Sequence, residues 1–115
     1  MFKLLFTRSG KCKCEEPPFY YLKFHSKELG EDATHGEVSL EKCKKCGTYW
    51  LKYLIEQPQY TKAGRWWRVR ISQNDLENFT VEMAKSYIEN QDWCFVGGSF
   101  YDQGIHKKER PITVV

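Results

Sequence analysis

The sequence lacks an apolar run long enough to cross a membrane, for which about 18 consecutive apolar residues are needed. It also lacks a secretory signal peptide, because the short apolar run in the opening MFKLLFTRSG is followed by no small-residue cleavage site. We therefore expect a cytoplasmic protein with no membrane association, in which residues 2–6 form a strand of the folded domain.

Recognisable catalytic motifs are missing as well. The chain contains no H-E-x-x-H, no G-x-S-x-G and no G-x-x-x-x-G-K-[ST]. Its three histidines, His25, His35 and His106, lie far apart in polar or terminal segments. This inventory predicts that the protein is not an enzyme.

Internal repeats, low-complexity segments and linkers are also absent. The length of 115 residues suits one domain, and 41% hydrophobic with 16% aromatic residues is enough for one modest core. We expect residues 1–115 to form a single domain.

Charge is distributed unevenly along the chain, although the net charge is only +3. Residues 42–70 carry eight lysines and arginines and one glutamate, whereas residues 71–102 carry six acids and one lysine. This separation of basic and acidic segments could steer a charged partner. The isoelectric point of about 8.6 is, however, below that of many nucleic-acid-binding domains.

Five cysteines are present, an odd number that does not suit a complete disulfide framework in a chain without a secretory signal. Cys12 and Cys14 are separated by one residue, and a bridge between them would be strained. A metal site or a redox site is left.

Four of the cysteines form two close pairs, Cys12 with Cys14 and Cys43 with Cys46, which is how tetrahedral zinc sites are usually supplied. Gly47 can adopt the positive φ that brings backbone N–H groups towards the thiolates. CKKCG resembles the knuckle of zinc-ribbon and rubredoxin-like sites at Cys43, Cys46 and Gly47. The sequence therefore predicts a closed site in which four cysteines bind Zn²⁺. The neighbouring lysines would offset the thiolate charge: Lys11, Lys13, Lys42, Lys44 and Lys45.

Other interpretations of the cysteines stay open. They could be simple buried or unpaired thiols, and His25 or His35 could replace one cysteine ligand. A redox pair at Cys43 and Cys46 is disfavoured because the residues that follow look like a strand rather than a helix. Cys94, within the apolar run WCFVGG, is predicted to be a buried and inert core residue.

Alternating polarity predicts a hairpin with arms at 48–56 and 65–72. One face of the hairpin should be apolar: Tyr49, Leu51, Tyr53, Ile55, Trp67, Val69 and Ile71. The opposite face should carry tryptophans and cations: Trp50, Lys52, Leu54, Trp66, Arg68 and Arg70.

Further elements complete the expected fold. We expect a strand at 19–25, a polar loop at 26–37, and a helix after Thr80 as N-cap, with Val81, Ala84 and Ile88 along one stripe.

Residues 93–101 should form a central strand, with a bulge or close backbone approach at Gly97 and Gly98, and the C-terminal tail could add an edge strand. The fold class predicted is α+β: a small domain with an antiparallel sheet of about four or five strands, one principal helix and a zinc-ribbon-like site of four cysteines.

Two functions fit these features. The first is a non-catalytic, zinc-stabilised protein-interaction module, such as a small inhibitor or an immunity-type protein, whose unidentified partner could be acidic. The second is nucleic-acid binding, in which bases stack on aromatic rings while cations meet phosphates. In both, the predicted contact surface is an exposed Trp/Arg face made of Trp50, Lys52, Trp66, Arg68 and Arg70. The competing structural interpretation is that these cations stack on the tryptophans of an ordinary sheet, or that the helix covers the face.

Overall fold

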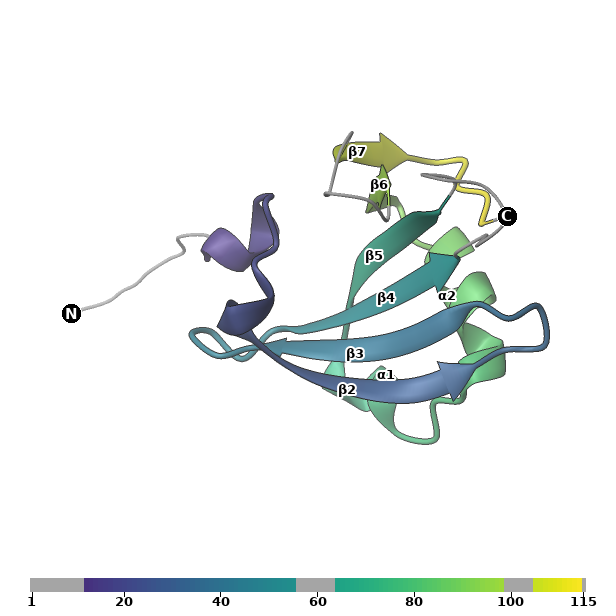
Figure 1. The fold of residues 1–115 in the computed structure, drawn as a ribbon, viewed down its shortest axis with the longest axis horizontal. Coiled ribbons are helices and arrows are strands. Elements are labelled where there is room, and N and C mark those ends of the chain that lie inside the picture. The colour runs from purple at the N-terminus through teal and green to yellow at the C-terminus, as the bar shows by residue number, and fades with distance from the viewer. Residues whose placement is uncertain (1–11, 56–63, 99–104, 115) are drawn as a thin grey trace.

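The computed structural model describes residues 12–55, 64–98 and 105–114. A six-stranded antiparallel sheet dominates these residues, and its strand order β2-β3-β4-β5-β6-β7 follows the chain (Figure 1). The strands are β2 (Phe24–Glu31), β3 (Glu37–Cys43), β4 (Tyr49–Ile55), β5 (Arg65–Ile71), β6 (Trp93–Gly98) and β7 (His106–Glu109). The strand expected at residues 2–6 lies outside the described residues.

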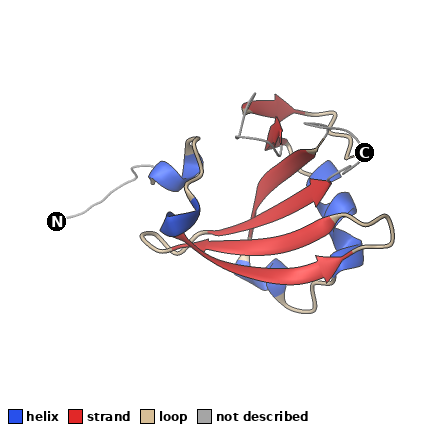
Figure 2. Ribbon diagram, in the orientation of Figure 1, coloured by secondary structure: helices blue, strands red, loops and turns tan. Residues whose placement is uncertain are grey.

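Helices are short wherever the structure is described. The 3-10 turns are η1 (Lys13–Glu15), η2 (Tyr21–Lys23) and η3 (Val81–Met83), and the α-helices are α1 (Gln73–Leu76) and α2 (Ala84–Glu89). The helices that follow β5 lie together against the sheet, whereas η1 and η2 lie at a separate place in the fold (Figure 2). Across the described ranges, no helix is both long and apolar enough to pass through a lipid bilayer.

The predicted fold class, a sheet of four or five strands with one principal helix, is wrong. In the part of the chain that the structure describes, the sheet has six strands and the longest helix covers six residues. Residues 26–37 account for part of the error, because most of this expected loop belongs to the hairpin of β2 and β3. Their polarity marks solvent exposure, whereas the strand is formed by backbone hydrogen bonds to its neighbour.

The expected strand at 19–25 is also wrong, because residues 21–23 form η2 and β2 begins at Phe24. The interior position predicted for residues 93–101 is correct for the described part, since β6 lies between β5 and β7. The close backbone approach is found at Gly97, where a Cβ would lie 2.5 Å from Cζ2 of Trp66.

One face of the sheet packs against α2, and we call its apolar cluster the helix-side core. The predicted apolar face of the hairpin is confirmed, because its residues all contribute to this cluster. Ala84 and Ile88 of α2 are fully buried against it, as their helical spacing predicted. The buried members are Val38, Leu51, Tyr53, Trp67, Val69, Ile71, Ala84, Ile88, Cys94, Ile112 and Val114.

The opposite face holds a second cluster, which we call the cysteine-side core: Cys14, Phe24, Cys43, Trp50, Trp66 and Phe95. Its cover is the segment of residues 12–23 rather than a long helix. Phe19 from this segment lies over the cluster, with its ring centroid 4.9 Å from that of Phe95 and 6.1 Å from that of Trp50. The sheet therefore separates two cores with different covers.

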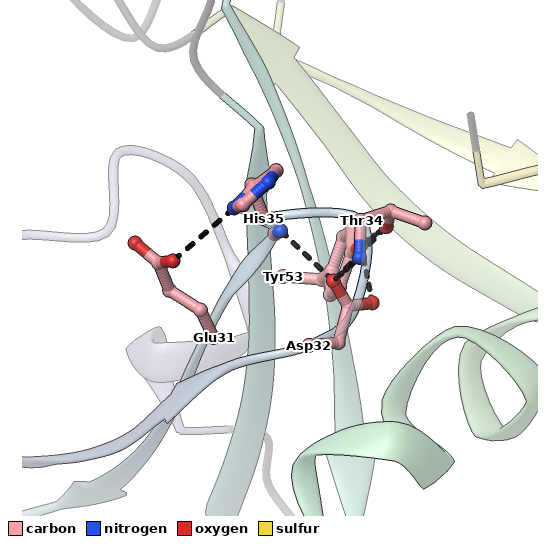
Figure 3. A network of polar contacts seen from close by, with 6 residues as sticks. Glu31, Asp32, Thr34, His35 and Tyr53 are labelled. Carbon is pink, nitrogen blue, oxygen red and sulfur yellow. Dashed lines mark hydrogen bonds and ion pairs between the residues drawn. The ribbon is translucent and has the colours of Figure 1, made fainter.

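A buried carboxylate closes the turn between β2 and β3 (Figure 3). Asp32 accepts hydrogen bonds from the N–H groups of Thr34 and Gly36 and from the Tyr53 hydroxyl, at 3.0, 2.9 and 2.6 Å. Burial alone would raise the pKa of Asp32, but these bonds lower it below its usual value. Burial and the bond to Asp32 raise the pKa of Tyr53 to about 12. The turn thus ties the hairpin end to the helix-side core.

Candidate metal centre

The second cysteine pair lies in the tight turn between β3 and β4. Cys43 ends β3, and its carbonyl accepts a hydrogen bond of 2.9 Å from the Gly47 N–H, while its own N–H donates to the Thr48 carbonyl at 2.9 Å. Gly47 has φ of +80°, as the sequence predicted. The turn therefore places Cys43 and Cys46 at one end of the sheet.

The first cysteine pair lies at η1. The Glu15 N–H donates to the Cys12 carbonyl at 3.1 Å, which curls the chain around Cys14 and buries its side chain. Further along, the Lys44 N–H donates to the Lys23 carbonyl at 3.0 Å. This bond holds the covering segment beside the β3–β4 turn, where Figure 1 shows η1 and η2.

The four sulfur atoms converge although 28 residues separate the two pairs. All lie within 4.8 Å of one another, with Cys12 Sγ 3.7 Å from Cys43 Sγ and Cys14 Sγ 3.5 Å from Cys46 Sγ. Four sulfurs bound tetrahedrally at about 2.3 Å from one ion would be about 3.8 Å apart. The separations far exceed a disulfide bond of about 2.05 Å, and all four cysteines are free. The group could hold one metal ion.

Histidine does not contribute to this group, which consists of cysteines alone. In the β2–β3 hairpin, Phe24 pairs with Cys43 at the cysteine end and Glu31 pairs with Glu37 at the opposite end. His35 lies in the turn at that opposite end, beside Glu31, and is therefore far from the cysteines. The predicted convergence of the two cysteine pairs is confirmed. The separate prediction that Cys94 is a buried core residue is also confirmed, and burial raises the pKa of its thiol to about 11.

The thiols differ in their electrostatic environment. Burial raises the pKa of Cys14 far above its usual value. Burial would also raise the pKa of Cys46, but its hydrogen bonds with the Thr48 side chain and backbone and with the neighbouring thiols lower it to about 7. A buried thiol keeps its proton unless a cation replaces it, and a coordinated metal ion removes that proton. The cluster therefore suits thiolates that share one divalent cation.

Arg68 lies buried under this cluster, with 2% of its surface exposed. Its guanidinium pairs with Glu41 and lies 4.4, 4.5 and 4.8 Å from the ring centroids of Phe19, Phe24 and Trp50. Burial lowers the pKa of Arg68 to about 9, while negative charge on the nearby Cys14 acts in the opposite direction. Among the described residues, its Nε and Nη2 have no hydrogen-bond partner.

The expected exposed Trp/Arg face is wrong for three of its five residues. Trp50, Trp66 and Arg68 are 0%, 3% and 2% exposed, because residues 12–23 cover them. Lys52 is half-buried with its Nζ 5.4 Å from the Trp66 ring centroid. Arg70 is exposed and lies 3.5 Å from Glu15. Stacking of Arg68 on Trp50 matches the competing structural interpretation, although a chain segment rather than the helix provides the cover.

Sequence reasoning missed a pocket of about 730 Å³ beside the cysteine cluster. Its walls come from both elements that carry the cysteines: residues 12–24 and the turn at 43–45. Tyr20 and Leu22, each 52% exposed, are part of its lining. The signal in the sequence was PPFYYL, an apolar stretch that two glutamates separate from the first cysteine pair.

The resemblance to a zinc-binding knuckle covers Cys43, Cys46 and Gly47 and extends to no further part of the chain. Functional inference therefore rests on the geometry of this chain's own residues. Comparison with protein-family models, with curated proteins and with solved structures found no match.

Proposed function

We propose that this chain is a non-catalytic protein-interaction module stabilised by Zn²⁺, with Cys12, Cys14, Cys43 and Cys46 as ligands. The observation that carries the proposal is the approach of all four Sγ atoms to within 4.8 Å of one another. Two distant segments of the chain supply the two cysteine pairs, so a bound ion would link these segments. The energy of binding would then contribute directly to folding.

Zinc is the ion that this donor set favours. An all-thiolate group is soft, which excludes magnesium and calcium as preferred ions, and Zn²⁺ has no geometric demand beyond the tetrahedron. A single tetrahedral iron is the competing ion with the same ligands. Thiolate ligands also persist best in a reducing compartment, which agrees with the expected cytoplasmic location.

A structural rather than catalytic role follows from the number of ligands. Four thiolates would fill the coordination sphere and leave no position for water or substrate. Within residues 12–23, Cys14 is the one buried residue and Phe19 is half-buried, so little apolar surface holds this segment in place. The ion would keep the cover on the cysteine-side core and would position the surface that a partner contacts.

Nucleic-acid binding through the Trp/Arg face loses its main support, because Trp50, Trp66 and Arg68 are buried. Bases cannot stack on rings that Phe19 already covers. Protein interaction is therefore the function proposed.

Native mass spectrometry combined with elemental analysis of the purified chain tests the metal. We expect one zinc per chain, lost in Cys14→Ser and retained in the matched variant Cys94→Ser, whose cysteine is buried in the other core. A folded metal-free protein would contradict the proposal, as would iron in place of zinc or disulfides within the cluster.

Chemical cross-linking in native lysate tests the interaction. We expect the zinc-loaded chain to form a cross-linked adduct with a specific protein, and we expect the Cys14→Ser variant to form much less of it. Failure of the wild-type chain to retain any protein above background would contradict the interaction role while leaving the zinc site intact.

A further inference from the structure

We propose that the pocket beside the metal centre is the partner-docking surface, and that it binds an acidic segment of a protein partner that inserts one large apolar side chain. This inference rests on the proposed function and adds the place and the chemistry of the contact. The pocket has a volume of about 730 Å³, enough for a large side chain and its neighbours.

The apolar part of the pocket comes from the covering segment. Pro17, Pro18, Tyr20 and Leu22 belong to its lining, and the last two are each 52% exposed. These are two of the four large hydrophobic side chains exposed in the described chain. Apolar side chains that stay exposed next to a concave surface mark interaction sites, and a buried apolar anchor usually supplies much of the affinity.

The charged part of the pocket is predominantly basic. Four lysines line it, Lys13, Lys23, Lys44 and Lys45, against a single carboxylate, Glu16. All four lysines are exposed, so their ammonium groups are available to an approaching anion. An acidic partner segment complements this rim and would associate faster at low salt.

A short acidic segment fits this charge distribution better than a polynucleotide does. A zinc ion bound by four thiolates would carry a net charge of about −2, and Cys14 and Cys43 belong to the pocket lining. Glu16 adds a further negative charge. A continuous phosphate backbone would have to pass these charges, whereas a peptide can place a few carboxylates at the lysines and its apolar side chain between them.

The pocket depends on the metal centre for its shape. One wall, residues 12–24, carries Cys12 and Cys14, and the other wall, residues 43–45, belongs to the turn of the second pair. The ion that joins the two cysteine pairs therefore also joins the two walls. Docking at this surface should be lost together with the metal.

A display library of short peptides tests the proposal with the zinc-loaded full chain as target. The library combines several Asp or Glu positions with one random apolar position, and a matched library has Lys in place of the acids. We expect enrichment of acidic peptides with one large apolar residue, with affinity that falls as salt rises.

Two pairs of variants locate the binding site. Leu22→Ser and the double variant K44E/K45E should each weaken binding of an enriched peptide by about tenfold or more. Their controls are Tyr21→Ser, an exposed neighbour outside the pocket lining, and K107E/K108E, an exposed lysine pair on β7. Zinc content, measured for every variant, must equal that of the wild-type chain.

Each alternative result overturns the inference. Absence of acidic peptides from the selected pool removes the proposed partner chemistry, and equal loss in test and control variants removes the location. Binding of a single-stranded oligonucleotide that K44E/K45E abolishes would reassign the pocket to nucleic acid. If cross-linking retains a protein partner that Leu22→Ser and K44E/K45E still bind, the interaction role stands and the docking site is elsewhere.

Discussion

The two faces of the sheet are formed by the same strands, but different segments of the chain cover them. On the helix side, α2 inserts Ala84 and Ile88, both fully buried, into the core. On the cysteine side, residues 12–23 bury Cys14 and half-bury Phe19. Burial of apolar side chains stabilises the first cover, whereas the second buries too little apolar surface to be held in this way. The cysteine cluster therefore lies on the face whose cover buries less apolar surface.

Polar groups differ between the faces as well. On the helix side, Tyr53 donates to Asp32, whose carboxylate accepts two further backbone hydrogen bonds. On the cysteine side, Nε and Nη2 of Arg68 find no hydrogen-bond partner among the described residues. Unsatisfied buried groups reduce stability. The cysteine-side core therefore depends more on an additional source of binding energy.

Among the changes considered, removal of zinc should lower stability most, and it should act on the cysteine side of the sheet. A structural zinc site contributes on the order of 10 kcal/mol, so a strong chelator should release residues 12–23 and expose Trp50 and Trp66. Hydrogen exchange measured by mass spectrometry should show rapid exchange in the covering segment and the β3–β4 turn. Slow exchange of residues 12–23 after complete zinc removal would show that packing alone holds the cover.

Replacement of Arg68 tests the buried charge of the cysteine side. Arg68→Met should lower the free energy of unfolding by about 4 kcal/mol, because it leaves Glu41, 12% exposed at its side chain, without its ion partner. The double variant Arg68→Met/Glu41→Leu should recover most of this loss. Urea unfolding of the zinc-loaded proteins measures both.

The matched control is Arg70→Met, since Arg70 is exposed and its pair with Glu15 should contribute less than about 1 kcal/mol. A wild-type stability for Arg68→Met would mean that Glu41 is well solvated without its partner, and the polar contrast between the two faces would then disappear.

Alkaline pH should act on the helix side through Tyr53. Its pKa in the folded protein is about 12, above the usual value of 10, so the folded state holds the proton more tightly and stability falls as pH rises from about 10 to 12. The loss from this group is at most about 2.7 kcal/mol. Urea unfolding of the wild type and Tyr53→Phe across this range should show the extra loss in the wild type. Parallel curves for the two proteins would contradict the assignment.

The smallest effect is expected at the β3–β4 turn. Gly47→Ala should weaken zinc binding by about fivefold, because an L-residue at φ of +80° costs about 1 kcal/mol, while the nearest atom to its Cβ, Lys42 Cε at 3.9 Å, leaves room for it. Gly47→Asn should lose less, since asparagine tolerates this conformation. Competition with a chromophoric chelator measures the affinities, and unchanged affinity for Gly47→Ala would show that the turn adapts freely.

Prediction from sequence was successful where the signal is local. The alternation of residues 66–71 predicted which side chains share a face, because successive residues of a strand point to opposite sides. Prediction failed at residues 26–31, where an exposed strand is as polar as a loop and is defined by its pairing with β3. It also failed for the exposure of Trp50 and Trp66, because Phe19 approaches them from a segment distant in the sequence.

Local sequence is enough to predict the two close cysteine pairs, the positive φ at Gly47 and the apolar stripe at Ala84 and Ile88, since each depends on neighbours within a few residues. The meeting of the two pairs, the burial of Arg68 and the pocket beside the cysteines are visible in the folded chain alone. These features depend on contacts between residues about 20 or more positions apart, and no local period or spacing encodes which distant segment covers a sheet face.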